Sequence, residues 1–205
     1  MTLPSLYVPQ SPEDFIGDAA KYARLLNRVV TDAKAAGNAP IKVLFNGEPG
    51  IGKSALARYF IQLLGANPKW SVTKLNGTQV KIEKVEEIAQ ALWYREMFGS
   101  YRVVWIEEAD AIPTVAQVRL LTMVDDLPSG CAVICTSNCV AADFVKRFQT
   151  RFKVYEVDAP SAADIHVLLG KFLTNKQTIT QIAEFSCGNV RAALLDAETA
   201  LQSAA

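Results

Sequence analysis

The sequence has no excess of charge of either sign, because 21 Lys and Arg balance 21 Asp and Glu over 205 residues. A polybasic nucleic-acid binder carries a basic excess, so any nucleic-acid contact must come from a local patch or from assembly. No uncharged apolar run reaches 18 residues, which argues against a membrane span. The first residues carry no basic segment followed by an apolar one, so a signal peptide is not expected.

Histidine and cysteine are also scarce, with one His and four Cys. A lone histidine, His166, excludes a multi-histidine metal site, and four cysteines do not make a disulfide scaffold. Cys131 and Cys135 are four residues apart on an expected strand and share a face, which favours buried thiols over metal ligands. We therefore expect a reduced, cytoplasmic or nucleoid-associated protein. Half of the residues are hydrophobic, enough for one sizeable core.

The apolar periodicity alternates between strand and helix patterns up to about residue 159 and is purely helical beyond it. This predicts an α/β fold with a five-stranded parallel sheet covered on both faces, followed by a small all-helical lid. The glycine-rich loop described below identifies the first part as a P-loop NTPase core. We expect the core at 1–159 and the lid at 160–205. The expected strands are 41–45, 70–75, 101–106, 131–136 and 153–157. The expected helices are 18–36, 53–64, 82–98, 114–125, 140–148, 161–173, 178–186 and 189–202. Residues 1–17 are proline-rich and are expected to be irregular.

A glycine-rich loop follows the first expected strand and opens a helix. It reads Gly47-Glu48-Pro49-Gly50-Ile51-Gly52-Lys53-Ser54, followed by Ala55, and matches the G-x-x-x-x-G-K-[ST] pattern in full. Its glycines let backbone N–H groups turn towards phosphate oxygens, and the following helix adds the positive end of its dipole. Lys53 would reach the β- and γ-phosphates, and Ser54 would place its hydroxyl on Mg²⁺.

A second strand ends in two carboxylates, Glu107 and Glu108. A P-loop enzyme needs one carboxylate to hold Mg²⁺ through water and another to polarise the attacking water. We assign Glu107 to the metal shell and Glu108 to water activation. The usual first residue is Asp, and the extra methylene of Glu107 leaves a hydrolysis-deficient nucleotide binder as an alternative. A solvated acidic turn is the other.

Together these motifs resemble the AAA+ ATPases, and within them the clamp-loader type, replication factor C small subunits and their relatives. The resemblance covers nearly the whole chain. Its N-terminal box, which cups adenine in the family, is matched by Tyr7-Val8-Pro9 and Ile16-Gly17. The usual Arg before the proline is Val8 here.

The resemblance also implies roles for three polar residues. Asn138, after an apolar strand, is similar to the sensor 1 residue that orients water against the γ-phosphate. Arg151 resembles the arginine finger supplied in trans to a neighbouring subunit, which stabilises transition-state charge and is worth about 10³ or more in rate; Arg147 is the competing candidate. Arg191, in Gly188-Asn189-Val190-Arg191, is similar to sensor 2 and would couple nucleotide state to the lid.

Two features leave the assembly open. Gln117 follows Ala116, as in the Ala-Gln pair of clamp loaders, but an exposed helical Gln is equally consistent with the sequence. No segment resembles the C-terminal collar of clamp-loader subunits, so the resemblance does not by itself imply a pentamer held by collars.

The resulting expectation is an AAA+ ATPase that binds and hydrolyses Mg-ATP at subunit interfaces to remodel or load a DNA-associated assembly. Its partners would be other AAA+ subunits, reached through Arg151, and DNA or a DNA-bound protein, with no membrane. The rivals are a hydrolysis-poor ATP-dependent switch or scaffold, and a remodeller or helicase loader that acts on protein partners.

Overall fold

The computed structural model describes residues 2–94, 101–138 and 142–203. Five strands form one parallel sheet in the order β2-β3-β4-β1-β5. Their bounds are β1 Ile41–Asn46, β2 Val72–Asn76, β3 Arg102–Glu107, β4 Cys131–Ser137 and β5 Lys153–Glu156. The predicted P-loop type of α/β fold is confirmed. Parallel pairing brings the carboxyl ends of all these strands to the same edge of the sheet.

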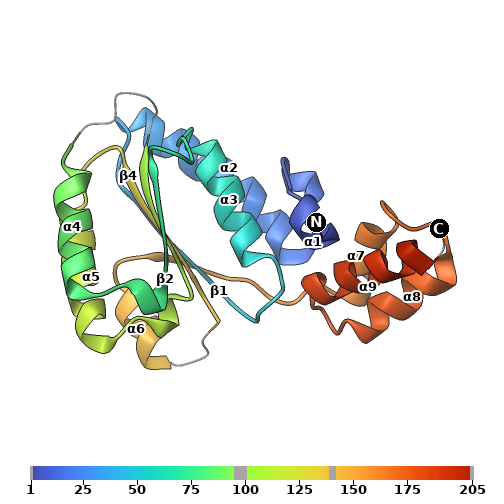
Figure 1. Ribbon diagram of the computed structural model, residues 1–205. Helices are drawn as coiled ribbons and strands as arrows, with labels where there is room; N and C mark the ends of the chain where they lie inside the picture. The colour runs from blue at the N-terminus through green and yellow to red at the C-terminus, as the bar shows by residue number, and fades with distance from the viewer. Residues whose placement is uncertain (1, 95–100, 139–141, 204–205) are drawn as a thin grey trace.

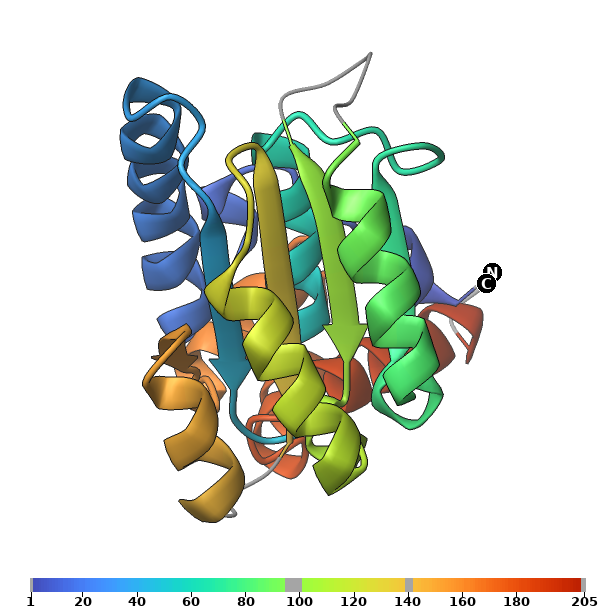
Figure 2. The same ribbon diagram turned by 90° about the vertical axis from the view of Figure 1, so that its left-hand side faces the viewer.

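Helices cover both faces of the sheet (Figures 1 and 2). One face packs against α2 (Gly17–Ala35) and α3 (Lys53–Leu63), and the other against α4 (Ile82–Leu92), α5 (Thr114–Asp125) and α6 (Ala142–Gln149). Alternate residues of β1 serve the two cores: Val43 and Phe45 face α2 and α3, and Leu44 faces the opposite layer. Burial on both sides explains the near-continuous apolar strands.

After Pro160 the chain forms α7 (Ala162–Leu169), α8 (Lys176–Phe185) and α9 (Val190–Ser203). Ser161 caps α7 with a reciprocal capping box to Asp164, and Asn175 caps α8 by accepting from backbone N–H groups. These helices share an apolar cluster of their own, centred on Ile165 and Ile179. The division at 159/160 remains our prediction for the domain boundary.

The N-terminal residues are more ordered than their proline content predicts. They form a short helix, α1 (Leu3–Leu6), and a 3₁₀ turn, η1 (Pro12–Asp14). Helix α1 lies beside α9 (Figure 1), with Leu3 packed against the lid cluster and its N–H donating to Glu198 Oε2 at 2.8 Å. Tertiary packing rather than propensity explains a helix of this length.

Several predicted boundaries shift. Helix α4 ends at Leu92 rather than running to residue 98, and residues 95–98 of that prediction lie outside the described part of the chain. The helix predicted at 161–173 ends at Leu169, because the segment from Gly170 turns before α8. In the described residues, no helix combines the length and apolarity that crossing a membrane requires. Cys131 and Cys135 are buried, as expected.

The central strand β4 generates a test of the core. Ile134 is fully buried and lies in register with Val43 on one side and Trp105 on the other. We expect Ile134→Ala to lower the free energy of unfolding by about 2–5 kcal/mol through lost burial and a residual cavity. Urea denaturation followed by circular dichroism measures this. The control Val115→Ala, at a side chain 67% exposed on α5, should change it by less than about 0.5 kcal/mol. Equal effects of the two changes would contradict this account of the core.

Candidate functional site

A cavity of about 330 Å³ opens at the carboxyl edge of the sheet, between the core and the lid helices. It gathers most of the residues that the motifs single out. The predicted residues that line it are Tyr7, Pro9, Ile16, Pro49, Gly50, Ile51, Gly52, Lys53, Ser54, Ala55, Glu107, Glu108, Asn138 and Arg191. Val8, Gly17, Glu48 and Arg151 are not part of this lining. A volume of this size lies at the lower end of the range for small-molecule sites.

The glycine-rich loop connects β1 to α3 with a backbone that only glycine adopts readily. Gly50 and Gly52 have φ of +84° and +105°, in the left-handed region. A Cβ at Gly50 would stand 2.2 Å from Asn189 Oδ1, so this position also needs glycine to let the lid approach. Helix α3 begins directly after Gly52, which aims its N-terminal N–H groups at the cavity.

Lys53 is the first residue of α3 and is only 6% exposed. Its ammonium donates to the backbone carbonyls of Gly47, at 2.9 Å, and Glu48. Burial lowers its pKa to about 8, with Asp110 opposing the shift and Arg191 adding to it. A buried ammonium held by neutral carbonyls is a site that an anion would stabilise.

The two carboxylates at the end of β3 point to different partners. Glu107 Oε2 lies 2.7 Å from Lys74 Nζ on β2. Glu108 has a left-handed backbone (φ +54°) and accepts a hydrogen bond from Asn76 Nδ2 at 2.9 Å. Strand β2 therefore supplies a partner to each carboxylate.

Sequence reasoning missed two residues here. Asn76 is not among the predicted site residues, yet it lines the cavity and holds Glu108. Asp110 accepts the backbone N–H of Asn138 at 3.1 Å, and so ties the acidic turn to the end of β4. Since carboxyl ends of parallel strands share one edge, the polar ends of neighbouring strands were the available signal.

The lid reaches the glycine-rich loop through the start of α9. The Arg191 N–H donates to the Gly50 carbonyl at 3.1 Å, and the Asn189 side chain accepts from the Ala192 N–H. Asn189 thus caps the start of α9. These bonds bring Arg191 to the cavity wall.

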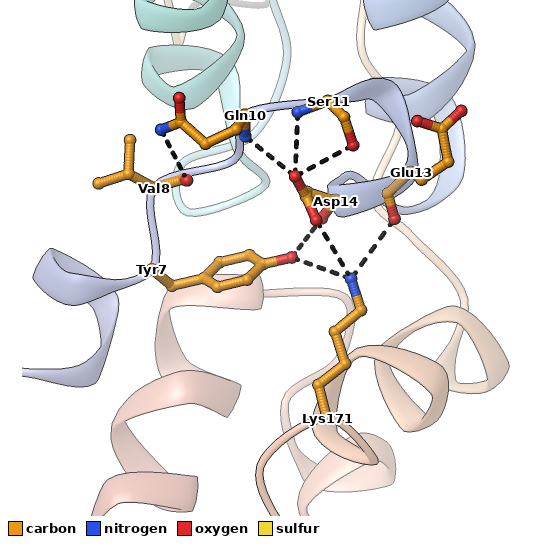
Figure 3. A network of polar contacts seen from close by, with 7 residues as sticks. All are labelled: Tyr7, Val8, Gln10, Ser11, Glu13, Asp14 and Lys171. Carbon is orange, nitrogen blue, oxygen red and sulfur yellow. Dashed lines mark hydrogen bonds and ion pairs between the residues drawn. The ribbon is translucent and has the colours of Figure 1, made fainter.

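The N-terminal segment contributes Tyr7, Pro9 and Ile16 to the cavity lining. Figure 3 shows the polar contacts that tie this segment to the lid. Tyr7 Oη donates to the Asp14 carbonyl at 2.5 Å, and its ring packs edge-on against Phe172. Lys171 Nζ donates to Tyr7 Oη and to the Glu13 carbonyl, and lies 3.7 Å from Asp14 Oδ1. One lysine after α7 therefore joins the lid to the segment that carries the predicted adenine box.

Asp14 organises this segment from within. Its Oδ2 accepts from the backbone N–H groups of Gln10 and Ser11 and from the Ser11 hydroxyl. These bonds, the Gln10 N–H first, hold the pKa of Asp14 below its ordinary value. Burial raises the pKa of Tyr7, which keeps its phenol protonated as a donor.

Arg151 lies away from the cavity. Its Nε is 2.9 Å from both carboxylate oxygens of Asp125, at the end of α5. Arg147, the competing candidate, is exposed on α6. Neither arginine is among the residues that line the cavity of its own chain.

Gln117 is buried and donates to the Ile112 carbonyl, so the alternative prediction of an exposed helical Gln at this position is wrong.

The Lys171 contacts generate a test that needs no ligand. Lys171→Met removes the charge that links the lid to Glu13 and Asp14. Since partly exposed ion pairs are weak, we expect backbone amides of residues 9–15 to exchange hydrogen about two- to fivefold faster. Hydrogen–deuterium exchange by mass spectrometry measures this, with Lys176→Met on exposed α8 as the control. Unchanged exchange in Lys171→Met would mean that the lysine does not restrain the segment.

Comparisons with known proteins agree with this geometry. The chain is 26% identical to a replication factor C small subunit from Methanocella arvoryzae, over 97% of this chain and 62% of that protein. It is 27% identical to the one from Methanosarcina mazei, over 73% of this chain and 44% of that protein. The chain thus spans less than two thirds of these relatives.

Solved structures share the fold. Two RuvB mutant structures from Thermotoga maritima superpose with a TM-score of 0.72 each, at 20% and 19% identity, over 91% and 92% of this chain and 63% of theirs. A RuvB from Paracoccus denitrificans is 44% identical over 62 residues, which is 30% of this chain and 18% of that protein.

A family model matches residues 43–156, from β1 to β5, and so includes the glycine-rich loop and the acidic strand end. This match covers more than half of the chain. The chain belongs to the ATPase family associated with various cellular activities (AAA).

Proposed function

We propose that this protein binds Mg-ATP in the cavity at the sheet edge and hydrolyses it between subunits, to remodel or load a DNA-associated assembly. The observation that carries the proposal is the buried ammonium of Lys53 beneath a glycine-rich loop, in one cavity with Glu107, Glu108 and Arg191. Membership of the AAA family supports nucleotide binding. The similarity to replication factor C small subunits and to RuvB supports the type of client.

The residues present fit a nucleoside triphosphate. The Lys53 ammonium is buried, and the two acceptors that it contacts are backbone carbonyls rather than carboxylates. Phosphate oxygens would stabilise its positive charge through charge-assisted hydrogen bonds. Backbone N–H groups at the start of α3 would bind the same anion. Tyr7, Pro9 and Ile16 offer apolar surface to the adenine ring of the nucleotide.

The donors also fit Mg²⁺, which prefers hard oxygen ligands and keeps several waters. The Ser54 hydroxyl and the Glu107 carboxylate both line the cavity and would hold the ion. When bound, Mg²⁺ would neutralise charge that develops on the phosphates. We keep these assignments as proposals.

Glu108 is the proposed general base, which would take the proton of the attacking water. In the structure its Oε2 accepts from Asn76 Nδ2, and the remaining lone pairs of the carboxylate can still accept the proton. Asn138 would orient the water, and its backbone is fixed by Asp110. Arg191, at the start of α9, would let the lid respond to the γ-phosphate.

Arg151 is the proposed finger for a neighbouring subunit. Asp125 holds its guanidinium through two equal contacts, which would pre-orient it on the subunit surface. A fixed arginine supplied in trans is worth about 10³–10⁵ in rate in related phosphoryl-transfer systems. A neighbour of the same or a similar kind is therefore part of the proposal.

The rival, a hydrolysis-poor switch, has an observation in its favour. Both carboxylates at the end of β3 already have partners on β2, Lys74 and Asn76. The second rival acts on protein partners alone, and absence of DNA binding at low salt would favour it.

Phosphate release tests the proposal. We expect Lys53→Ala to abolish turnover through lost phosphate binding, and Glu108→Gln to lower it about 10²-fold or more through the lost base. Equal rates for wild type and Lys53→Ala would contradict ATP hydrolysis at this site. Equal rates for wild type and Glu108→Gln, with Lys53→Ala inactive, would contradict the role of Glu108 as general base.

Mixing inactive variants tests the trans arginine. We expect Arg151→Ala and Glu108→Gln each to be inactive, and their mixture to regain activity, because the Glu108→Gln subunit still donates Arg151 to an intact neighbouring site. Arg147→Ala, the control, should keep its activity without a partner variant. A mixture as inactive as its parts, or activity retained by Arg151→Ala alone, would exclude the assignment.

The lowered pKa of Lys53 predicts a pH dependence of nucleotide affinity. Only the ammonium form attracts phosphates, and it is lost from the free protein as pH rises through about 8. Bound phosphates would raise this pKa, so binding takes up a proton and affinity falls above pH 8, by at most about tenfold per unit. Calorimetry with a non-hydrolysable ATP analogue between pH 7 and 9.5 measures it.

The matched control is Lys53→Arg, whose guanidinium stays charged throughout this range. Its affinity should not depend on pH between 7 and 9.5. Parallel profiles for Lys53→Arg and the wild type would show that Lys53 is not the group responsible.

A further inference from the structure

The ion pair between Lys74 and Glu107 is the feature that the proposed reaction does not account for. Lys74 Nζ lies 2.7 Å from Glu107 Oε2, with side chains 46% and 25% exposed. Glu107 lines the cavity, whereas Lys74 does not. Lys74 therefore acts on the site only through Glu107.

The β2–β3 register builds this pair. Lys74 is directly opposite Trp105, and Asn76 is opposite Glu107. Because alternate residues of a strand share a face, Trp105 and Glu107 lie on the same side of β3 as their partners. Lys74 Nζ stands 4.1 Å from the centre of the Trp105 ring, close enough for a cation–π attraction that favours this rotamer. The longer side chain of Glu, in place of the usual Asp, gives the carboxylate its reach towards β2.

We propose that Lys74 competes with Mg²⁺ for the Glu107 carboxylate and so sets the Mg²⁺ concentration at which the nucleotide site fills. The inference rests on the proposed function, since it concerns the same site. An ammonium in contact with the carboxylate neutralises it and repels a dication. The metal then gains Glu107 only by displacing Lys74 or by binding against its charge.

Lys74 is thus a positioning residue with a predictable sign. Removing its charge should make Mg²⁺ bind more tightly, whereas loss of a merely structural contact would loosen the site and weaken Mg²⁺. The pair is partly exposed, so its effect is modest: we expect a change of about two- to fivefold. This modest size suits a site that responds to Mg²⁺ rather than one that excludes it.

The test titrates Mg²⁺ against the full chain in the presence of a fluorescent non-hydrolysable ATP analogue and reads the midpoint from fluorescence anisotropy. Lys74→Met keeps an apolar stem against Trp105 but removes the charge, and its midpoint should fall about two- to fivefold. Lys74→Arg keeps the charge and should keep the wild-type midpoint. The matched control is Lys84→Met, which breaks an ion pair of equal length, Lys84 with Glu87 at 2.7 Å on α4, away from the cavity lining.

The same titration in a Glu107→Gln background shows whether the effect passes through the carboxylate. There, adding Lys74→Met should leave the midpoint unchanged. An unchanged or raised midpoint in Lys74→Met overturns the inference, as does a fall of equal size in Lys84→Met or in the Glu107→Gln background. If Lys74→Met does not fold, a lowered midpoint in Lys74→Gln supports the inference and an unchanged one overturns it. Failure of the wild type to bind the analogue at any Mg²⁺ concentration would instead contradict the proposed nucleotide site.

Discussion

Parallel pairing of β3 and β1 with β4 is the constraint on which the site depends. It aligns Asn46 with Ser137 and Ile106 with Cys135, so the chain leaves all three strands at the same edge. The glycine-rich loop, the acidic pair and Asn138 each follow one of these strand ends. The backbone itself therefore brings the three turns together at the shared cavity. The buried core that fixes this pairing is therefore part of the machinery.

The N-terminal segment and the lid form the second half of the site. Leu3 packs with the lid cluster, and Lys171 holds Tyr7, Glu13 and Asp14. The wall that we assign to the adenine base is thus tied to the lid as well as to the core, where Phe15 packs against Tyr59 of α3. The Arg191 N–H meanwhile bonds the Gly50 carbonyl. A change in lid angle would then act on both proposed parts of the nucleotide site. Lys171 connects the lid to the wall proposed for adenine, and Arg191 connects it to the glycine-rich loop proposed for the phosphates.

The sequence was sufficient where the signal is local and contiguous. The P-loop, with its strand before and helix after, and the alternation of strands and helices predicted the sheet and its cavity. The short helix α1 could not be predicted, because packing on α9 stabilises it. The partners of Glu107 and Glu108 were missed for a different reason: a contact across β2 and β3 depends on strand register, which a single sequence does not state. Glu48 satisfies the loop motif by spacing and Val8 stands within the N-terminal box, yet neither residue lines the cavity.

The edge strand β2 gives the acidic pair its character. Lys74 and Asn76 are two residues apart, so both project to one face. Lys74 contacts Glu107, the last residue of β3, and Asn76 contacts Glu108, which follows the strand. A one-residue slip of β2 would turn both to the opposite face and free both carboxylates at once. Position 107 carries Glu where P-loop enzymes usually carry Asp, and this difference does more than change the reach of the carboxylate towards Mg²⁺. It accompanies a cation on the neighbouring strand, and the two residues together set how much negative charge the strand end offers to the cavity.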